Sequence, residues 1–142
     1  MSDDLYQKAI NTLWGIKDLA NAAHGAGRLE VPDGSALLDN PFCGDRVRIE
    51  ITRHNGVVAA LAQETKGCLL CRASASLLGL RAVGHDANEI ASARQALADM
   101  LRNHAPPPED WPEFSIFIPA RPHASRHGCV LLPFEALTQA LS

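Results

Sequence analysis

The sequence lacks the features that mark a membrane protein or a nucleic-acid-binding protein. None of its apolar stretches approaches the roughly 20 residues needed to cross a bilayer. Its net charge is −3 and its ten arginines are scattered, so a strongly basic nucleic-acid surface is absent. The acidic start at residues 1–4 is unlike a signal or transit peptide. We therefore expect a cytoplasmic protein that binds neither membranes nor nucleic acids.

Disulfides are not expected either, although the chain has four cysteines. A length of 142 residues suits one compact domain spanning residues 1–142, which can bury a core without disulfides or a structural metal. Cysteines in a reducing compartment indicate metal or redox chemistry first. A metal site in this chain is therefore expected to serve a function rather than to hold a small fold together.

Hydrophobic periodicity predicts an α+β fold. The apolar residues fall at helical spacing in four segments, over residues 5–23, 68–80, 86–103 and 129–141. In the third of these segments, Asp86 and Glu89 form the pattern of a capping box. The remaining segments are expected to be a four-proline loop at 103–112, an extended or short helical piece at 114–118 and an irregular stretch at 119–128.

The clearest signal is a β-hairpin. Residues 47–51 alternate apolar and polar side chains, as in a half-buried strand. Asn55 and Gly56 then supply the two positive-φ positions of a type I′ turn, and an apolar return strand begins at Val57. A short segment at residues 35–38 can add a third antiparallel strand.

The turn also predicts which residues face each other. Counted outward from the turn, the expected pairs are His54–Val57, Ile51–Ala60, Asp45–Lys66 and Cys43–Cys68. A bulge would break this register far from the turn, but Cys43 and Cys68 emerge at the same open end of the hairpin in either case. A glycine beside each cysteine permits the sharp backbone bends of a ligand loop.

Three cysteines and one aspartate can form a single site. Cys68 and Cys129 each lie at the start of a predicted helix, where unpaired N–H groups favour a thiolate. Together with Cys43 they suit zinc or an iron–sulfur cluster, and an oxygen of Asp45 can complete a tetrahedral set. Simpler roles stay open: Cys129 alone fits a small buried apolar residue, and Asp45 fits a turn residue or a partner of Lys66.

Three short segments carry a more specific signal. Residues 39–46 read DNPFCGDR, residues 67–76 read GCLLCRASAS and residues 126–132 read RHGCVLL. The first resembles the NPxCGD motif of the NifU/IscU/SufU family of iron–sulfur scaffolds, and the second resembles that family's GC-x-x-x-x-ASAS segment. The third resembles the family segment in which a cysteine precedes the C-terminal helix. The three occur in order across nearly the whole chain and are together highly specific.

The details resemble the SufU type within this family. The predicted helix at 86–103 and its proline-rich loop form a longer insert than the IscU type carries, and Arg126 also fits the SufU type. The IscU type has a histidine directly before its third cysteine and an LPPVK chaperone motif, whereas this chain has Gly128 and no LPPVK. The SufU type usually has a basic residue there, so Gly128 departs from both. His127 is one residue further away and is interpreted as a surface histidine, with a ligand role as the alternative.

The resemblance implies a fold and a function. It implies a SufE/NifU-like fold with a three-stranded antiparallel sheet covered by helices, and a site made of Cys43, Asp45, Cys68 and Cys129. In the main interpretation the protein is a scaffold that accepts sulfur from a cysteine desulfurase, with Cys43 or Cys129 as persulfide acceptor. It then holds iron or a transient [2Fe–2S] cluster for apo-proteins. The alternative is a SufU-like sulfurtransferase, an enzyme with Zn²⁺ on the same residues. A carboxylate ligand suits a site that must release its cargo.

Cys71 and two serines are further residues of interest. Cys71 lies one helical turn after Cys68, and Cys-x-x-Cys spacing can chelate a metal or relay a persulfide. We interpret Cys71 as a buried helix residue, and Ser74 and Ser76 as residues that pack or bond locally. A purely structural zinc domain and a Cys–His hydrolase are the other functions considered. No orienting residue or oxyanion segment supports the hydrolase.

Overall fold

The structure is a computed structural model that describes residues 15–142. The predicted helix at 5–23 lies partly outside this range, and residues 15–22 of it are helical. No helix among the described residues is long and apolar enough to span a membrane.

The predicted hairpin and its third strand form one antiparallel sheet. The strands are β1 (Gly34–Asn40), β2 (Asp45–His54) and β3 (Val57–Lys66), in the order β1-β2-β3. The apolar side chains of β2, which are Val47, Ile49 and Ile51, are fully buried. Asn55 and Gly56 have φ values of 54° and 82°, as a type I′ turn requires. The expected sheet is therefore confirmed.

The predicted register holds only next to the turn. His54 pairs with Val57 as expected, but Arg53 pairs with Val58 and Thr52 with Ala60, so Ala59 is an extra residue in β3. This β-bulge shifts every later pair by one position. Ile51 therefore faces Leu61, and Lys66 faces Arg46 rather than Asp45. The expected pairing of Cys43 with Cys68 is wrong as well, because β2 begins at Asp45 and β3 ends at Lys66.

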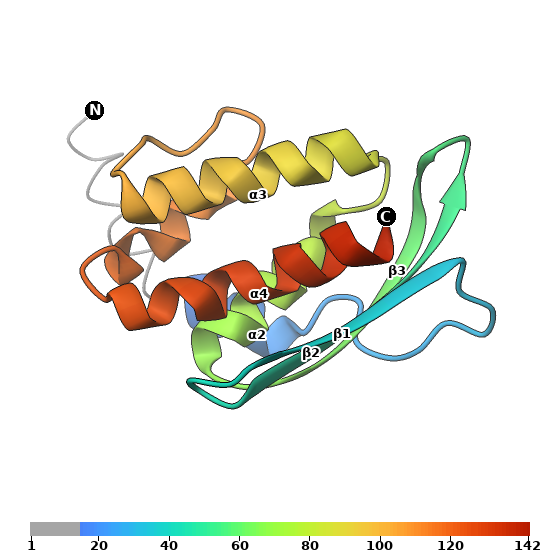
Figure 1. The fold of residues 1–142 in the computed structure, drawn as a ribbon, viewed down its shortest axis with the longest axis horizontal. Helices are drawn as coiled ribbons and strands as arrows, with labels where there is room; N and C mark the ends of the chain where they lie inside the picture. Colours follow the sequence, from blue (N-terminus) through green and yellow to red (C-terminus); the bar gives the residue numbers. More distant parts are fainter. Residues whose placement is uncertain (1–14) are drawn as a thin grey trace.

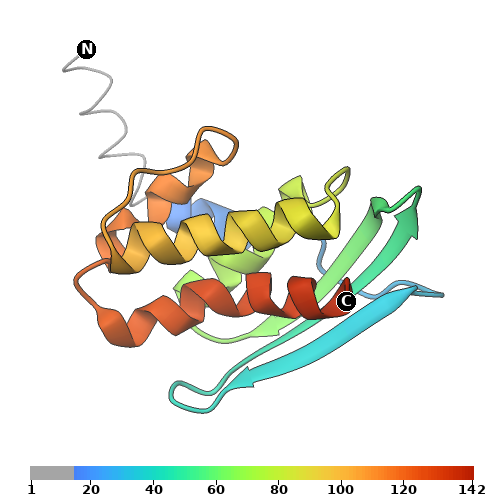
Figure 2. The same ribbon diagram turned by 45° about the horizontal axis from the view of Figure 1, so that its top comes forward.

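Helices α2 (Leu69–Arg81) and α4 (Ala124–Ala140) cover the apolar face of the sheet, and α3 (Ala87–Arg102) packs on α4. Figures 1 and 2 show α2 and α4 lying over the strands, with α3 packed along α4. The capping box is confirmed, because Glu89 N–H donates to the Asp86 side chain while Asp86 N–H donates to Glu89. The stripe predicted for α3 is buried: Ile90, Ala93, Leu97 and Leu101.

The chain between α3 and α4 differs from the expectation in two places. Residues 114–118, expected to be either extended or helical, belong to the 3₁₀ helix η1 (Pro112–Ala120). The helical alternative is therefore the correct one. The stretch expected to be irregular at 119–128 already contains the start of α4 at Ala124, five residues before the predicted start. Residues 123–127 carry no apolar periodicity, so the sequence pattern cannot distinguish this first helical turn from a loop.

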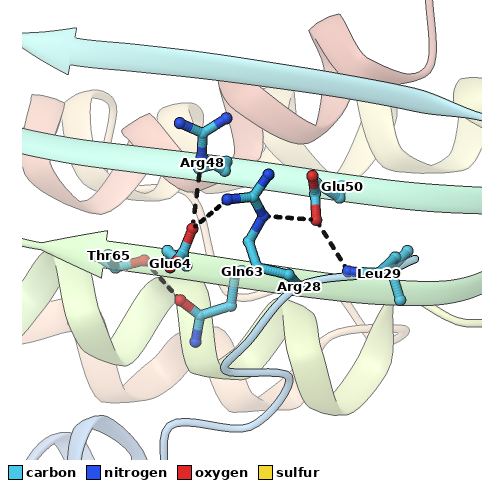
Figure 3. A network of polar contacts seen from close by, with 7 residues as sticks. All are labelled: Arg28, Leu29, Arg48, Glu50, Gln63, Glu64 and Thr65. Carbon is cyan, nitrogen blue, oxygen red and sulfur yellow. Dashed lines mark hydrogen bonds and ion pairs between the residues drawn. The ribbon is translucent and has the colours of Figure 1, made fainter. Parts of the chain in front are cut away.

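A polar network covers part of the opposite face of the sheet. A segment at residues 26–29 crosses this face, and Figure 3 shows Arg28 and Leu29 reaching Glu50 on β2. Leu29 N–H donates to Glu50 over 2.9 Å and Arg28 Nε over 3.2 Å. These hydrogen bonds, that of Leu29 first, hold the pKa of Glu50 below its usual value. Glu50 is thus a satisfied buried carboxylate that fixes the segment leading into β1.

Candidate thiol and metal site

The four residues expected in the site come together at one end of the sheet. Figure 1 shows that the β1–β2 turn, the start of α2 and the first turns of α4 meet there. The Sγ atoms of Cys43 and Cys129 are 3.2 Å apart, although 86 positions separate them in sequence. Cys43, Asp45 and Cys129 offer ligand atoms that all lie within 4.8 Å of one another. The three are therefore spaced for a shared ion.

Cys68 joins this group through Asp45. The Cys68 N–H donates to Asp45 Oδ1 over 2.9 Å, and Cys68 Sγ lies 3.6 Å from Asp45 Oδ2. Asp45 is 1% exposed, so it is neither a simple turn residue nor a surface partner of Lys66. A Cβ atom on Gly67 would overlap the Asp45 carboxylate. Gly67 is therefore required here by close approach to Asp45, whereas Gly44 adopts a positive φ of 74°.

Cys129 reaches the site in a way that the sequence did not indicate. It is the sixth residue of α4 and fully buried, so its expected place at a helix start is wrong. Pro133, four residues later, has no N–H to donate to the carbonyl of Cys129. The neighbouring carbonyl of Val130 accepts a hydrogen bond of 2.6 Å from Ser74 Oγ on α2. Packing of α2 against α4 thus fixes the helix around Cys129.

Both serines of α2 form long-range hydrogen bonds. Ser74 bonds across to α4, and Ser76 Oγ accepts from His24 N–H over 2.9 Å. The two serines pack in the interior as expected, but their hydrogen bonds are long-range rather than local. Both serines are fully buried. A buried hydroxyl group needs a hydrogen-bond partner, and here tertiary packing supplies it.

Burial and hydrogen bonding shift the pKa values of Asp45, Cys129 and Cys71 in this site. Burial opposes ionisation of Asp45, but hydrogen bonds from Cys43, Cys129 and Cys68 outweigh it and lower the pKa of Asp45. Burial, followed by contacts with Cys43 and Asp45, strongly raises the pKa of Cys129. Burial and the nearby charge of Asp45 also raise the pKa of Cys71. A metal that binds Cys129 must therefore displace a proton.

His127 does not lie at the surface. It is 7% exposed, and its Nε2 lies 3.1 Å and 3.0 Å from the carbonyl oxygens of Ala120 and Arg121. Since both neighbours are acceptors, Nε2 carries the proton and binds backbone at the end of η1. The expectation of a surface histidine is wrong. This nitrogen is engaged with backbone and is not free to ligate.

The site is open on the side of the β1–β2 turn. Cys43 is exposed and Cys68 is half-buried, whereas Cys71 and Cys129 are fully buried. Phe42, directly before Cys43, is 97% exposed. Cys43 and Cys68 are therefore accessible to a partner protein, whereas Cys129 is not.

The donor set fits a soft metal. Three thiol groups suit zinc or iron–sulfur clusters, and one carboxylate oxygen brings the set to four. All four cysteines are free thiols. The arrangement can bind a metal ion or carry sulfur on a thiol, because both chemistries need reduced cysteine.

Comparison with known proteins identifies the family. The family model described as NifU-like N terminal domain matches residues 16–111, more than half of the chain. The chain belongs to this family. The matched range contains Cys43, Asp45 and Cys68 and ends before Cys129.

Individual relatives agree with this assignment. The iron–sulfur cluster assembly scaffold protein IscU of Thermotoga maritima is 27% identical over 128 residues, which covers 89% of each chain. The zinc-dependent sulfurtransferase SufU of Bacillus subtilis is 31% identical over 65 residues, or 46% of this chain and 44% of that protein. The family expected from the three motifs is confirmed, and with it a role in iron–sulfur cluster assembly at the level of the family.

Solved structures share the whole fold. The N-terminal part of a nitrogen-fixing NifU-like protein from Brucella abortus matches with a TM-score of 0.86 at 31% identity, covering 92% of this chain and 93% of that one. An iron–sulfur cluster assembly scaffold protein for the SUF system from Fervidobacterium islandicum AW-1 matches with a TM-score of 0.82 at 21% identity, covering 90% and 94%. The α+β fold with a three-stranded antiparallel sheet is confirmed.

Proposed function

We propose that this protein is a cytoplasmic scaffold on which iron and sulfur are assembled into a transient [2Fe–2S] cluster. The ligands are Cys43, Asp45, Cys68 and Cys129, and the cluster is cargo that passes to apo-proteins. The observation that carries the proposal is the convergence of three thiols around one buried carboxylate at the open end of the sheet. Family membership supports it independently.

Sulfur enters from a cysteine desulfurase at the exposed side of the site. Cys43 is the accessible acceptor for persulfide sulfur. Cys129 lies 3.2 Å from it, so sulfur can pass from one thiol to the other without a large movement. Asp45 supplies an oxygen ligand, which holds a soft cluster less firmly than a thiolate and favours release.

A second function uses the same residues with a different ion. A SufU-like sulfurtransferase, which is an enzyme, would hold Zn²⁺ on this set and pass sulfur onward without building a cluster. The partial match to the zinc-dependent sulfurtransferase of Bacillus subtilis supports this alternative. The set of four donor groups also supports this alternative, because zinc prefers tetrahedral coordination.

Metal and sulfide analysis of protein purified without oxygen separates the two functions. The scaffold function predicts that iron, sulfide and a cysteine desulfurase give a protein with two iron and two sulfide per cluster and a visible absorption spectrum. Tight stoichiometric zinc that persists through this treatment, with no cluster formed, would contradict it and favour the sulfurtransferase.

The Asp45→Ala variant tests the carboxylate. We expect its cluster to persist longer than in the wild type, because the labile oxygen ligand is gone. The half-life of the visible absorption in the presence of a chelator measures this. Asp39→Ala is a matched control, since Asp39 lies on neighbouring β1 and pairs with Arg46 at the surface. Equal half-lives for wild type and Asp45→Ala would show that Asp45 is not a ligand.

A further inference from the structure

Cys71 lies beside the site but is not needed as one of its four ligands. It is the third residue of α2 and fully buried, and Cys68 is the half-buried N-cap of the same helix. The Arg72 N–H donates to the carbonyl of Cys68 over 3.0 Å, so Cys68 and Cys71 belong to the same first turn of α2. An accessible thiol one turn before a protected one is the arrangement of a redox pair.

The two thiols can be joined without unfolding the helix. Helix geometry places the Cα atoms of residues three positions apart about 5 Å from each other. Disulfides join residues whose Cα atoms are about 4.4–6.8 Å apart. Cys68 has extended backbone angles, with φ −70° and ψ 168°, and its side chain caps nothing. Its side chain can therefore turn towards Cys71 without breaking a hydrogen bond within α2.

Cluster assembly needs a source of electrons for sulfur. The sulfur delivered as a persulfide is at the oxidation level of elemental sulfur, whereas a cluster contains sulfide. Each sulfur atom must therefore gain two electrons. Two thiols that become a disulfide supply two electrons.

We propose that Cys71 is the resolving thiol that releases sulfide from a persulfide on Cys68. This step rests on the sulfur-accepting role proposed above, and adds that sulfur taken up on the exposed Cys43 passes to the half-buried Cys68. Cys71 Sγ attacks Cys68 Sγ, the bond between Cys68 Sγ and the outer sulfur breaks, and the outer sulfur leaves as hydrosulfide. The proton of the Cys71 thiol goes to the leaving sulfur, which departs as H₂S. The sulfane sulfur is reduced by two electrons, the two cysteines are oxidised to a disulfide, and a dithiol reductant restores them.

The positions of the thiols favour a disulfide between Cys68 and Cys71 over one between Cys43 and Cys129. Cys43, Asp45 and Cys129 lie within 4.8 Å of one another and can hold iron while Cys68 is occupied. A disulfide between Cys43 and Cys129 would instead remove two of those three ligands. Cys68 Sγ lies 3.6 Å from Asp45 Oδ2, so sulfide released at Cys68 appears beside that trio.

A single-turnover experiment tests the step. Wild type, Cys71→Ala and Cys71→Ser are mixed anaerobically with a cysteine desulfurase and one equivalent of cysteine, without added thiol. In the wild type we expect one sulfide per chain and a Cys68–Cys71 disulfide, detected by peptide mass spectrometry. In both variants we expect the persulfide to remain on Cys68. Sulfide release should fall at least about 100-fold, since an intramolecular nucleophile is lost. Zinc binding stoichiometry should be unchanged in both, which shows that the variants fold.

The other outcomes separate this step from the proposed function. A persulfide on Cys68 that persists equally in wild type and Cys71→Ala overturns the role of Cys71 and leaves the sulfur-accepting role standing. A Cys43–Cys129 disulfide, or sulfide release unchanged in the variants, overturns it as well. Absence of persulfide and sulfide from all three proteins would instead contradict the sulfur-accepting role itself.

Discussion

The dipeptide Gly-Cys occurs twice in the site, and the two copies have different structures. Gly67-Cys68 directly follows β3, where a Cβ on Gly67 would overlap the Asp45 carboxylate and Cys68 is the N-cap residue of α2. Gly128-Cys129 lies inside α4, where the nearest atom to a Cβ on Gly128 would be the Asn40 side-chain amide nitrogen at 3.1 Å. The first glycine is fixed by a buried carboxylate, whereas the second only borders a polar side chain.

The difference shows that two kinds of support hold one site. Cys68 is held by a hydrogen bond from its own N–H to Asp45, so its position depends on a local polar contact. Cys129 is held by the packing of a helix interior and by the bond from Ser74 to Val130. Substitutions near Cys68 should therefore affect stability through the contact with Asp45. Substitutions near Cys129 should affect it through the stability of helix α4.

Gly67→Ala should have the largest effect. Its methyl group would overlap the Asp45 carboxylate and push it away from Cys68 N–H. We expect the free energy of unfolding of the metal-free protein to fall by about 2–3 kcal/mol, as overpacking costs in a filled interior. Urea denaturation with a chelator present measures this, and zinc titration should show weakened binding. Stability and zinc binding equal to those of the wild type would refute the contact.

The charge of Asp45 should have a smaller and pH-dependent effect. Its pKa is lowered in the folded protein, so its ionised form stabilises the fold above the unfolded-state pKa of about 3.9. Metal-free Asp45→Asn should therefore be about 1.5 kcal/mol less stable than wild type at pH 7, the range of a hydrogen bond to a charged group. That difference should shrink as pH falls through the lowered folded-state pKa.

Urea denaturation of both proteins at several pH values between neutral and strongly acidic provides the measurement. Asp39→Asn serves as the control, because Asp39 is a surface residue paired with Arg46. A difference between wild type and Asp45→Asn that stays constant with pH would mean that ionisation of Asp45 does not stabilise the fold.

Gly128→Ala should have the smallest effect and the opposite sign. Alanine favours a helix interior over glycine by up to about 1 kcal/mol. The new methyl group needs only a small movement of the Asn40 side chain. We expect a gain of about 0.5 kcal/mol in the free energy of unfolding, measured by urea denaturation beside Gly67→Ala. A loss as large as that of Gly67→Ala would show that the two glycines are equivalent after all.

Local patterns predicted most of the elements. The alternation in β2, the Asn55-Gly56 turn and the Asp86–Glu89 capping box each depend on neighbouring residues, and the structure contains all three. The family motifs also identified the four residues that converge. Structural features that depend on residues a few positions apart can therefore be predicted from the sequence.

The sequence alone determined the strands, the turn, the capped helix and the family, because their signals are short-range. Tertiary structure decided how the site is put together. The bulge at Ala59 moved Lys66 away from Asp45, and the early start of α4 placed Cys129 inside a helix. Ser74 donates to the carbonyl of Val130 on α4 instead of bonding within α2. His127 bonds to the carbonyl of Ala120 instead of lying at the surface. These outcomes depend on which surfaces pack together, and one strand or helix alone does not specify that.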